Sequence, residues 1–226
     1  MTQIYKLSPS DFAYLWNDCK HCYYQKVKFG ITQKSIFPSM FTYINKLLQT
    51  SIMGKNPQDI LPELPSGIID IQEGYIKSVK IPNTNCYISG RFDILTKLDD
   101  GTYGLIDFKI TNPDEEKVLK KYSSQLQAYK FGLENPGDGK KPIKISEMGA
   151  VTVNPGSMEL VNGKVVFTAT PKWHPISEDM EGFYKLTQNI SELLEGPLPP
   201  TTATCNLCIY RKSFEPKNKT TDDIPF

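Results

Sequence analysis

Apolar and polar positions alternate with two different periods along this chain of 226 residues. In some stretches apolar side chains recur with helical spacing, whereas other stretches are rich in β-branched and aromatic residues and are bounded by turn-forming residues, which is typical of strands. The pattern therefore predicts an α/β fold with a mixed central β-sheet flanked by helices. Helices are expected over 8–22, 38–50, 115–133 and 176–195, and strands over 68–81, 87–98, 102–110, 145–154 and 160–168.

The length of the chain fits a single domain with one core. The hydrophobic content is 39%, and no run of eighteen apolar residues is present, so we expect no membrane span. A net charge of +1 argues against a large, diffuse surface for polyanions. Within the domain 1–226 we expect a helical N-terminal segment (1–65), a β-rich core (66–170), a C-terminal helix with a cysteine pair (171–212) and a mobile tail (213–226).

Two predicted strands flank the turn Asp99–Gly101, which indicates a β-hairpin. A three-residue loop with its glycine in the left-handed conformation pairs residues whose numbers sum to 200, so Asp93 faces Asp107. Side chains two apart on a strand share a face, which places Lys109 beside Asp107. Since two facing carboxylates repel each other, the pattern predicts a divalent cation between them with a lysine alongside.

The Asp-x-Lys triplet has a simpler interpretation, because alternating charge on a solvated strand face produces it often. The residues around the triplet favour a metal site instead. Gly90 precedes the first acid and allows a backbone or ligand to approach closely. The second acid lies in an apolar strand, where an unpaired charge is costly. Farther along, Gln125 and Tyr129 are four residues apart and share one face of a predicted helix.

Three short motifs in this order resemble the PD-(D/E)xK nuclease superfamily, in particular its RecB-type branch, which includes CRISPR-associated iron–sulfur exonucleases. The motifs are Gly-Arg-Phe-Asp (90–93), Ile-Asp-Phe-Lys (106–109) and Gln-x-x-x-Tyr (125–129). The resemblance spans most of 8–212. It implies a restriction-endonuclease-like core, with catalysis in 66–170, and a metal-dependent DNA nuclease in the cytoplasm.

The resemblance also implies roles for individual residues. Asp93 and Asp107, with the main-chain carbonyl of Phe108, would bind Mg²⁺ or Mn²⁺. Lys109 would orient the attacking water or stabilise the transition state. The chemistry is consistent, because hard oxygen ligands suit magnesium and a bound divalent ion lowers the pKa of its water.

The helix that follows the hairpin would contact the substrate. By resemblance, Gln125 and Tyr129 position the phosphodiester backbone. Lys117, Lys120 and Lys121 precede them on the same predicted helix and are candidate phosphate contacts, although such a run is often only a solvated face. The expected activity is exonucleolytic trimming of single-stranded or frayed DNA, with a helicase or CRISPR-type protein as a partner. The alternative is a catalytically silent nucleic-acid-binding subunit.

One position departs from the family. RecB-type relatives usually carry a metal-binding histidine on a helix before the hairpin, and here the helix expected at 39–51 has none. Tyr43, Asn45 and Gln49 are its candidate polar replacements. Glu73, also before the hairpin, is either a further acid of the site or a solvated edge residue.

Four cysteines form two Cys-x-x-Cys pairs near opposite ends of the chain, a complete set for a tetrahedral zinc or an iron–sulfur site. Such a site would join the two ends. The pairs also resemble those of the iron–sulfur RecB-type members, which take one cysteine from the N-terminal region and three from the C-terminal region. The split here is two and two, so we expect a 4Fe–4S cluster with structural Zn²⁺ as the alternative, or else two independent pairs. The four residues are Cys19, Cys22, Cys205 and Cys208.

Overall fold

The computed structural model describes residues 3–32, 39–111 and 114–213, so the tail expected from 213 onward lies almost entirely outside the described residues. No helix within these ranges has both the length and the apolar character needed to cross a bilayer. The helices are α1 (Pro9–Tyr14), α2 (Lys20–Phe29), α3 (Ser39–Ile52), α4 (Glu115–Glu134), α5 (Met180–Glu195) and α6 (Asn206–Lys212), with a short 3₁₀ turn at Pro57–Asp59.

The strands form two mixed sheets, in the orders β1-β4-β3 and β2-β5-β6-β7-β8. The β1–β4 and β6–β7 pairs are parallel and the other pairs are antiparallel. The predicted mixed α/β class is therefore confirmed. The strands are β1 (Tyr5–Leu7), β2 (Gly67–Gln72), β3 (Tyr75–Lys80), β4 (Cys86–Arg91), β5 (Ile94–Leu98), β6 (Tyr103–Ile110), β7 (Ile145–Val161) and β8 (Lys164–Pro175).

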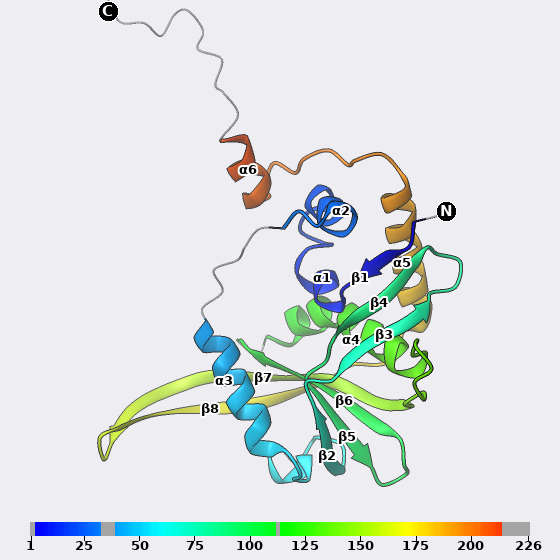
Figure 1. The fold of residues 1–226 in the computed structure, drawn as a ribbon. Helices are drawn as coiled ribbons and strands as arrows, with labels where there is room; N and C mark the ends of the chain where they lie inside the picture. Colours follow the sequence, from blue (N-terminus) through cyan, green and yellow to red (C-terminus); the bar gives the residue numbers. More distant parts are fainter. Residues whose placement is uncertain (1–2, 33–38, 112–113, 214–226) are drawn as a thin grey trace, which may run out of the picture.

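Helices cover the larger sheet on both faces (Figure 1). Leu105 of β6 packs in a large core with apolar residues of α4 and α5. Its neighbours Ile106 and Phe108 point the other way, into a second core that includes Ile52 of α3. The alternation along β6 thus separates a face toward α4 from a face toward α3, as the strand period requires.

The hairpin register agrees with the prediction. β5 and β6 pair antiparallel with Ile94 opposite Ile106 and Lys97 opposite Tyr103, so the paired residue numbers sum to 200. Gly101 closes the turn with a φ of 82°, a left-handed conformation that a glycine adopts without strain.

Two predicted strands are each divided in two. The strand expected over 68–81 breaks between β2 and β3, where Glu73 has a φ of 50°. The strand expected over 87–98 breaks between β4 and β5. The two breaks lie side by side, because the Glu73 N–H donates to the Asp93 carbonyl at 2.7 Å and the Phe92 N–H donates to the Gly74 carbonyl at 3.0 Å. This double break separates the two sheets and places Asp93 at their junction.

Other boundaries also differ from the prediction. The helix expected over 8–22 is divided into α1 and α2, and α2 has Cys19 as its N-cap. The strands expected over 145–154 and 160–168 are parts of one long hairpin whose turn lies at Asn162 and Gly163. The ladder continues past Pro155 with only a register shift between Pro155 and Ser157. Helix α6 was not expected.

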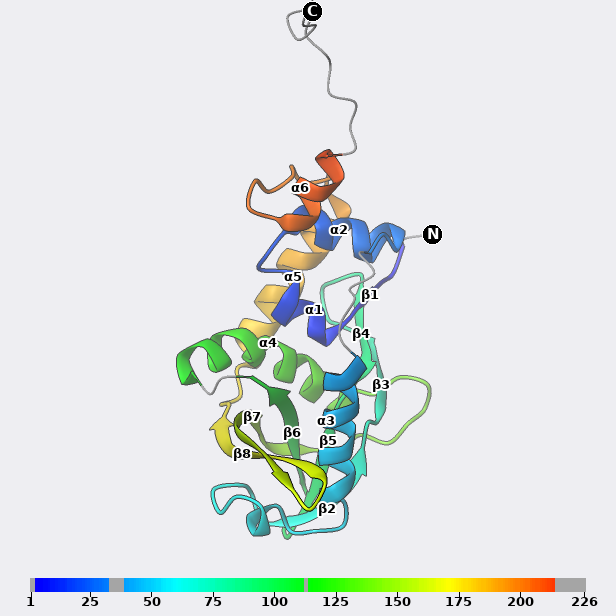
Figure 2. The same cartoon turned by 90° about the vertical axis from the view of Figure 1, so that its left-hand side faces the viewer.

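The chain ends meet at one pole of the molecule. In both views α2 and α6 lie side by side, at the end opposite β2 (Figures 1 and 2). The N-terminal and C-terminal cysteine pairs are therefore brought together by the fold.

Gly90 of β4 is packed so closely that a side chain would not fit. A Cβ atom there would lie 2.8 Å from Cδ of Pro9, at the start of α1. We expect Gly90→Ala to lower the free energy of unfolding by about 1–3 kcal/mol, because the rigid proline ring has to move. Urea denaturation followed by circular dichroism measures this. Gly156→Ala is the control, since a Cβ at Gly156 would meet only the Thr168 carbonyl oxygen, at 3.8 Å. Equal urea midpoints for Gly90→Ala and Gly156→Ala would contradict the close packing of Gly90 against Pro9.

Candidate functional site

The acid pair lies where the hairpin meets the double break. Asp107 projects from β6 and is 2% exposed, and Asp93 follows β4. Oδ2 of Asp93 accepts a hydrogen bond of 2.9 Å from the Phe108 N–H, which ties the first acid to the strand of the second. Burial raises the pKa of Asp93 to about 7, and repulsion from Asp107 adds to that rise. The two carboxylates therefore disfavour each other's charge.

Lys109 partly offsets this repulsion. Its Nζ lies 2.7 Å from Oδ2 of Asp107, and its side chain is 16% exposed. Burial alone would lower the pKa of Lys109, but attraction by Asp107 and Asp93 outweighs burial and raises it. The side chain is therefore an ammonium group that serves as a fixed positive charge. As the spacing of two predicted, it lies on the same face of β6 as Asp107.

Helix α4 contributes two buried polar side chains. Nε2 of Gln125 donates to Oδ1 of Asp107 at 3.3 Å and orients that carboxylate. The Tyr129 hydroxyl donates to the main-chain carbonyl of Arg91 at 2.5 Å, which holds the end of β4 just before Asp93. In this structure Tyr129 thus contacts the protein backbone, and burial raises the pKa of its hydroxyl.

A cavity of about 390 Å³ adjoins this group, and Lys109 forms part of its wall. Of the three candidate phosphate-binding lysines, all exposed, only Lys121 belongs to the described lining of the cavity. Lys117 forms an ion pair with Asp114 at 2.8 Å, and Lys120 lies on the same outer surface of α4. The expected lysine run is therefore next to the site, with one member inside it.

Helix α3 supplies the replacements for the absent histidine. Tyr43 is 63% exposed and points away. Asn45 lines the cavity, and within the described residues its Oδ1 has no hydrogen-bond partner. Gln49 is 1% exposed, and neither atom of its amide has a partner among the described residues. The two amides are four residues apart and share a helical face, so Asn45 and Gln49 remain as candidate replacements for the histidine.

The position of Gln49 along the sheet can be inferred from its neighbour. Thr50 hydrogen-bonds the Gln72 side chain at 3.2 Å, and Gln72 pairs with Ile94, the residue after Asp93. This turn of α3 therefore crosses the sheet at the level of the acid pair. Glu73 lies at the same junction, half-buried, in a loose ion pair of 3.7 Å with Arg91.

These residues fit a hard divalent cation. Unpaired buried amide oxygens are costly unless a donor or an ion satisfies them. A magnesium site built from one or two carboxylates, neutral oxygens and water has this composition. Asp93 and Asp107 would hold such an ion, with Gln125 orienting the Asp107 carboxylate.

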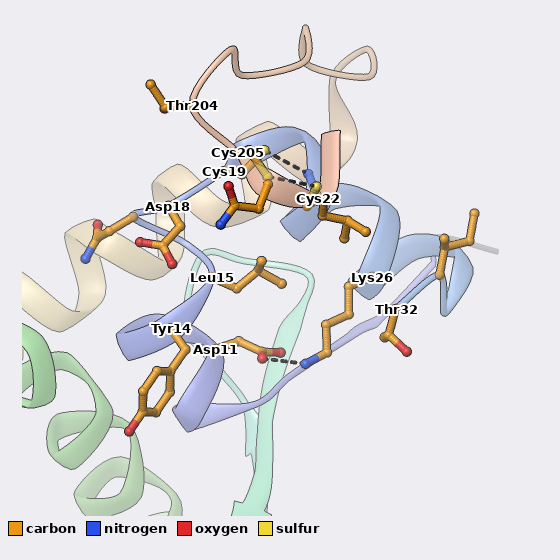
Figure 3. Close-up of a pocket in the computed structure, with 14 residues that line it drawn as sticks. Asp11, Tyr14, Leu15, Asp18, Cys19, Cys22, Lys26, Thr32, Thr204 and Cys205 are labelled. Carbon is orange, nitrogen blue, oxygen red and sulfur yellow. Dashed lines mark hydrogen bonds and ion pairs between the residues drawn. The ribbon is translucent and has the colours of Figure 1, made fainter. Parts of the chain in front are cut away.

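The four cysteines form a second and separate group. Their sulfur atoms all lie within 4.8 Å of one another, and within the described ranges no other cluster of three or more His, Cys, Asp or Glu side chains could share an ion. Cys22 Sγ is 3.5 Å from Cys208 Sγ and 3.7 Å from Cys205 Sγ, and Cys19 Sγ is 3.7 Å from Cys208 Sγ. Figure 3 shows Cys19, Cys22 and Cys205 gathered beside α2. The expectation that both ends of the chain join at one metal-binding set is thus confirmed.

The thiols of this group differ, since burial raises the pKa of Cys22 and Cys208. Cys19 caps α2, and Cys205 is the N-cap position of α6, where the helix dipole stabilises negative charge. Burial raises the pKa of Cys19, but hydrogen bonds with Thr202 and Cys22 outweigh it and lower that pKa to about 6. None of the cysteines is in a disulfide, and Cys86 is buried elsewhere.

No protein-family model matches this chain, and no curated protein is similar to it. Among solved structures, the fold is similar to that described as "Crystal structure of SSO0001", with a TM-score of 0.56 and 15% identity. The match covers 94% of this chain and 86% of that one. It shows a shared fold over nearly the whole chain, while function has to be argued from the site.

We expect Mg²⁺ or Mn²⁺ to raise the melting temperature, because a cation relieves the repulsion between Asp93 and Asp107. Asp107→Ala should abolish this shift. Gln125→Leu should weaken the metal affinity by about tenfold, as is usual when a supporting polar group is lost. Differential scanning fluorimetry over a metal titration measures both.

The control is Asp138→Ala, which removes an exposed carboxylate that pairs only with Lys77 in the described structure. It should keep the full shift. An undiminished shift in Asp107→Ala would show that the ion binds elsewhere.

Proposed function

We propose that this chain is a metal-dependent DNA nuclease of the PD-(D/E)xK type, of the RecB-type branch, that trims single-stranded or frayed ends. One observation carries the proposal. Asp93 accepts a hydrogen bond of 2.9 Å from the Phe108 N–H, next to Asp107 on β6, and the Lys109 ammonium lies 2.7 Å from Asp107. The fold similarity to SSO0001 is compatible with it.

Hydrolysis of a phosphodiester bond needs an activated water and an offset for charge growing on the phosphate oxygens. A bound Mg²⁺ or Mn²⁺ supplies a water of lowered pKa and Lewis acidity. The chain supplies the rest. Asp93 and Asp107 supply the negative charge that would bind the cation. Lys109 places a positive charge beside the cavity, where it stabilises the transition state. Gln125 and Tyr129 hold this geometry without movement.

Positive charges on the cavity wall and on the outer surface of α4 support a nucleic-acid substrate. Lys109 and Lys121 line the cavity, and Lys117 and Lys120 continue the positive charge along α4. Lysine side chains bind phosphates without reading sequence. This arrangement favours a strand backbone as the ligand. We further propose a cytoplasmic enzyme that acts with a helicase or CRISPR-type partner, since unbridged cysteines suit a reducing compartment.

For the cysteine group we propose a single structural Zn²⁺ in place of the 4Fe–4S cluster favoured by resemblance. A tetrahedral zinc with Zn–S bonds of about 2.3 Å requires sulfurs about 3.8 Å apart. Three sulfur pairs are 3.5 to 3.7 Å apart, and all four sulfurs lie within 4.8 Å of one another, which is close to that value. Thiolates that bind four separate irons have to stand farther apart, because the cluster lies between them.

We expect the wild-type protein to degrade end-labelled single-stranded DNA only with Mg²⁺ or Mn²⁺. Asp107→Ala and Lys109→Ala should each lower the rate by at least about 100-fold, the usual cost of removing one charge-stabilising group. Gel electrophoresis of the labelled products measures this, and Asp138→Ala is the control that should keep full activity.

Equal rates of DNA degradation by the wild type and by Asp107→Ala would contradict the proposal that this chain is a nuclease. A wild-type protein that binds DNA without cutting it in either metal would instead support the alternative, a silent binding subunit. The lack of a histidine on α3 is the feature that favours that alternative.

Metal analysis tests the zinc proposal. We expect one zinc per chain and a colourless protein, and Cys208→Ser should lose the zinc and melt at a lower temperature. Cys86→Ala is the control, because Cys86 is buried away from the group and its loss should leave the zinc content unchanged. Iron with an absorption band near about 400 nm would restore the cluster interpretation.

A further inference from the structure

Tyr14 joins two cavities. One is the cavity of about 390 Å³ at Lys109, and the other, of about 880 Å³, runs along α1 to the cysteine group. Tyr14 is the one described residue that lines both. Figure 3 shows it at the α4 end of the larger cavity, with Cys19, Cys22 and Cys205 at the other end.

The ring of Tyr14 is fixed in place and still exposed. Its hydroxyl lies 3.2 Å from the Tyr122 hydroxyl, and the two rings meet edge to face with centroids 6.0 Å apart. The Lys121 ammonium lies over the Tyr14 ring at 4.2 Å. The side chain nevertheless remains 45% exposed. A rigid, exposed aromatic ring beside a phosphate-binding lysine is a stacking platform for a nucleobase.

Tyr122 connects this platform to the proposed catalytic group. The Lys109 ammonium lies 4.9 Å from the centroid of the Tyr122 ring. The order Lys109, Tyr122, Tyr14 therefore leads outward from the acid pair. A base stacked on Tyr14 would be the first or second neighbour of a phosphate held beside Lys109, because successive nucleotides lie a few ångströms apart.

The larger cavity suits bases better than phosphates. Asn17, Thr204 and Asn206 line it, and their amides and hydroxyls can both donate to and accept from base edges. Among its described lining residues Lys26 is the one cation, and it is already paired with Asp11. Phosphate charge is better accommodated on the other side, at Lys109 and Lys121.

We propose that Tyr14 stacks a base of single-stranded DNA at the junction of the two cavities and guides the strand along α1 toward the cysteine group. The inference rests on the proposed nuclease function and names its substrate path. Paired bases in a duplex are already stacked and cannot splay onto the ring, so the platform selects single strands.

The test uses the full chain with a twelve-nucleotide oligothymidine in which one 2-aminopurine is moved along the strand. Binding is measured by fluorescence anisotropy on the wild-type background in EDTA, so that Lys109 is kept and the strand is not cut. We expect quenching of the probe at one position only. Tyr14→Leu should abolish that quenching and weaken binding about tenfold, the effect of losing one stacked base.

Two further variants separate stacking from structure. Tyr14→Phe keeps the ring but loses the hydroxyl contact with Tyr122, and should retain both the quenching and the affinity within about twofold of the parent. Tyr184→Leu removes a tyrosine of similar exposure, 40%, on α5, and should change neither. Unchanged quenching and affinity in Tyr14→Leu would overturn the inference.

The two proposals fail in different ways. If the wild type cuts no strand in Mg²⁺ or Mn²⁺ while the probe is still quenched through Tyr14, the nuclease function fails and the base platform stands. If the wild type cuts single strands while Tyr14→Leu behaves as its parent, the platform fails alone. If a blunt duplex of the same length binds as tightly as the single strand and loses affinity equally in Tyr14→Leu, the single-strand path is also overturned.

Discussion

The structure depends on two carboxylates held face to face in a buried position. Asp93 and Asp107 would separate if the chain allowed it, since burial and mutual repulsion raise the pKa of Asp93 to about 7. They stay together because each is fixed by backbone. Asp107 belongs to a central strand with neighbours on both sides, and Asp93 accepts the Phe108 N–H. The energy for this arrangement comes from the cores on the two faces of β6, so the fold stabilises a charge pattern that is unfavourable by itself.

The double break between the sheets places Asp93 beside Asp107 at the junction of the two sheets. Had β4 and β5 remained one strand, Asp93 would have been a regular ladder position with a neighbour on each side. The break at Phe92 and Asp93 frees this acid to bend toward β6, and Tyr129 fixes the preceding carbonyl of Arg91 from α4. Gln125, one turn earlier on the same helix, fixes Asp107. One helix therefore positions both acids, which explains why its two polar residues are four apart.

The hairpin register could be predicted because a three-residue turn with one left-handed glycine determines every pair beyond it. The breaks could not be predicted, because Glu73 adopts its left-handed conformation where its backbone bonds to the second break. The pattern of apolar residues in one strand does not show which other segment lies beside it. The division of 8–22 into α1 and α2 follows from Cys19, whose sulfur accepts the Cys22 N–H as the cap of α2 and also lies 3.7 Å from Sγ of the distant Cys208. Gln49 could be named from its position on α3, but its isolation from other polar groups is a tertiary property. Tyr14 gave no signal in the sequence at all.

The cysteine group and the acid pair lie at different places along the proposed path of the DNA strand. The group ties α6 to α2, and Lys26 of α2 in turn pairs with Asp11 of α1. Helix α1 begins with Pro9 against Gly90 and ends with Tyr14 between the two cavities. The four clustered cysteines are therefore connected through two helices to the wall of the proposed strand path, and not to the proposed catalytic residues. A metal at the cysteines would accordingly set where a strand lies and how firmly the chain ends are joined. The charges at Asp93, Asp107 and Lys109 would set what happens to the strand, because no cysteine lines the cavity at Lys109 in the described structure.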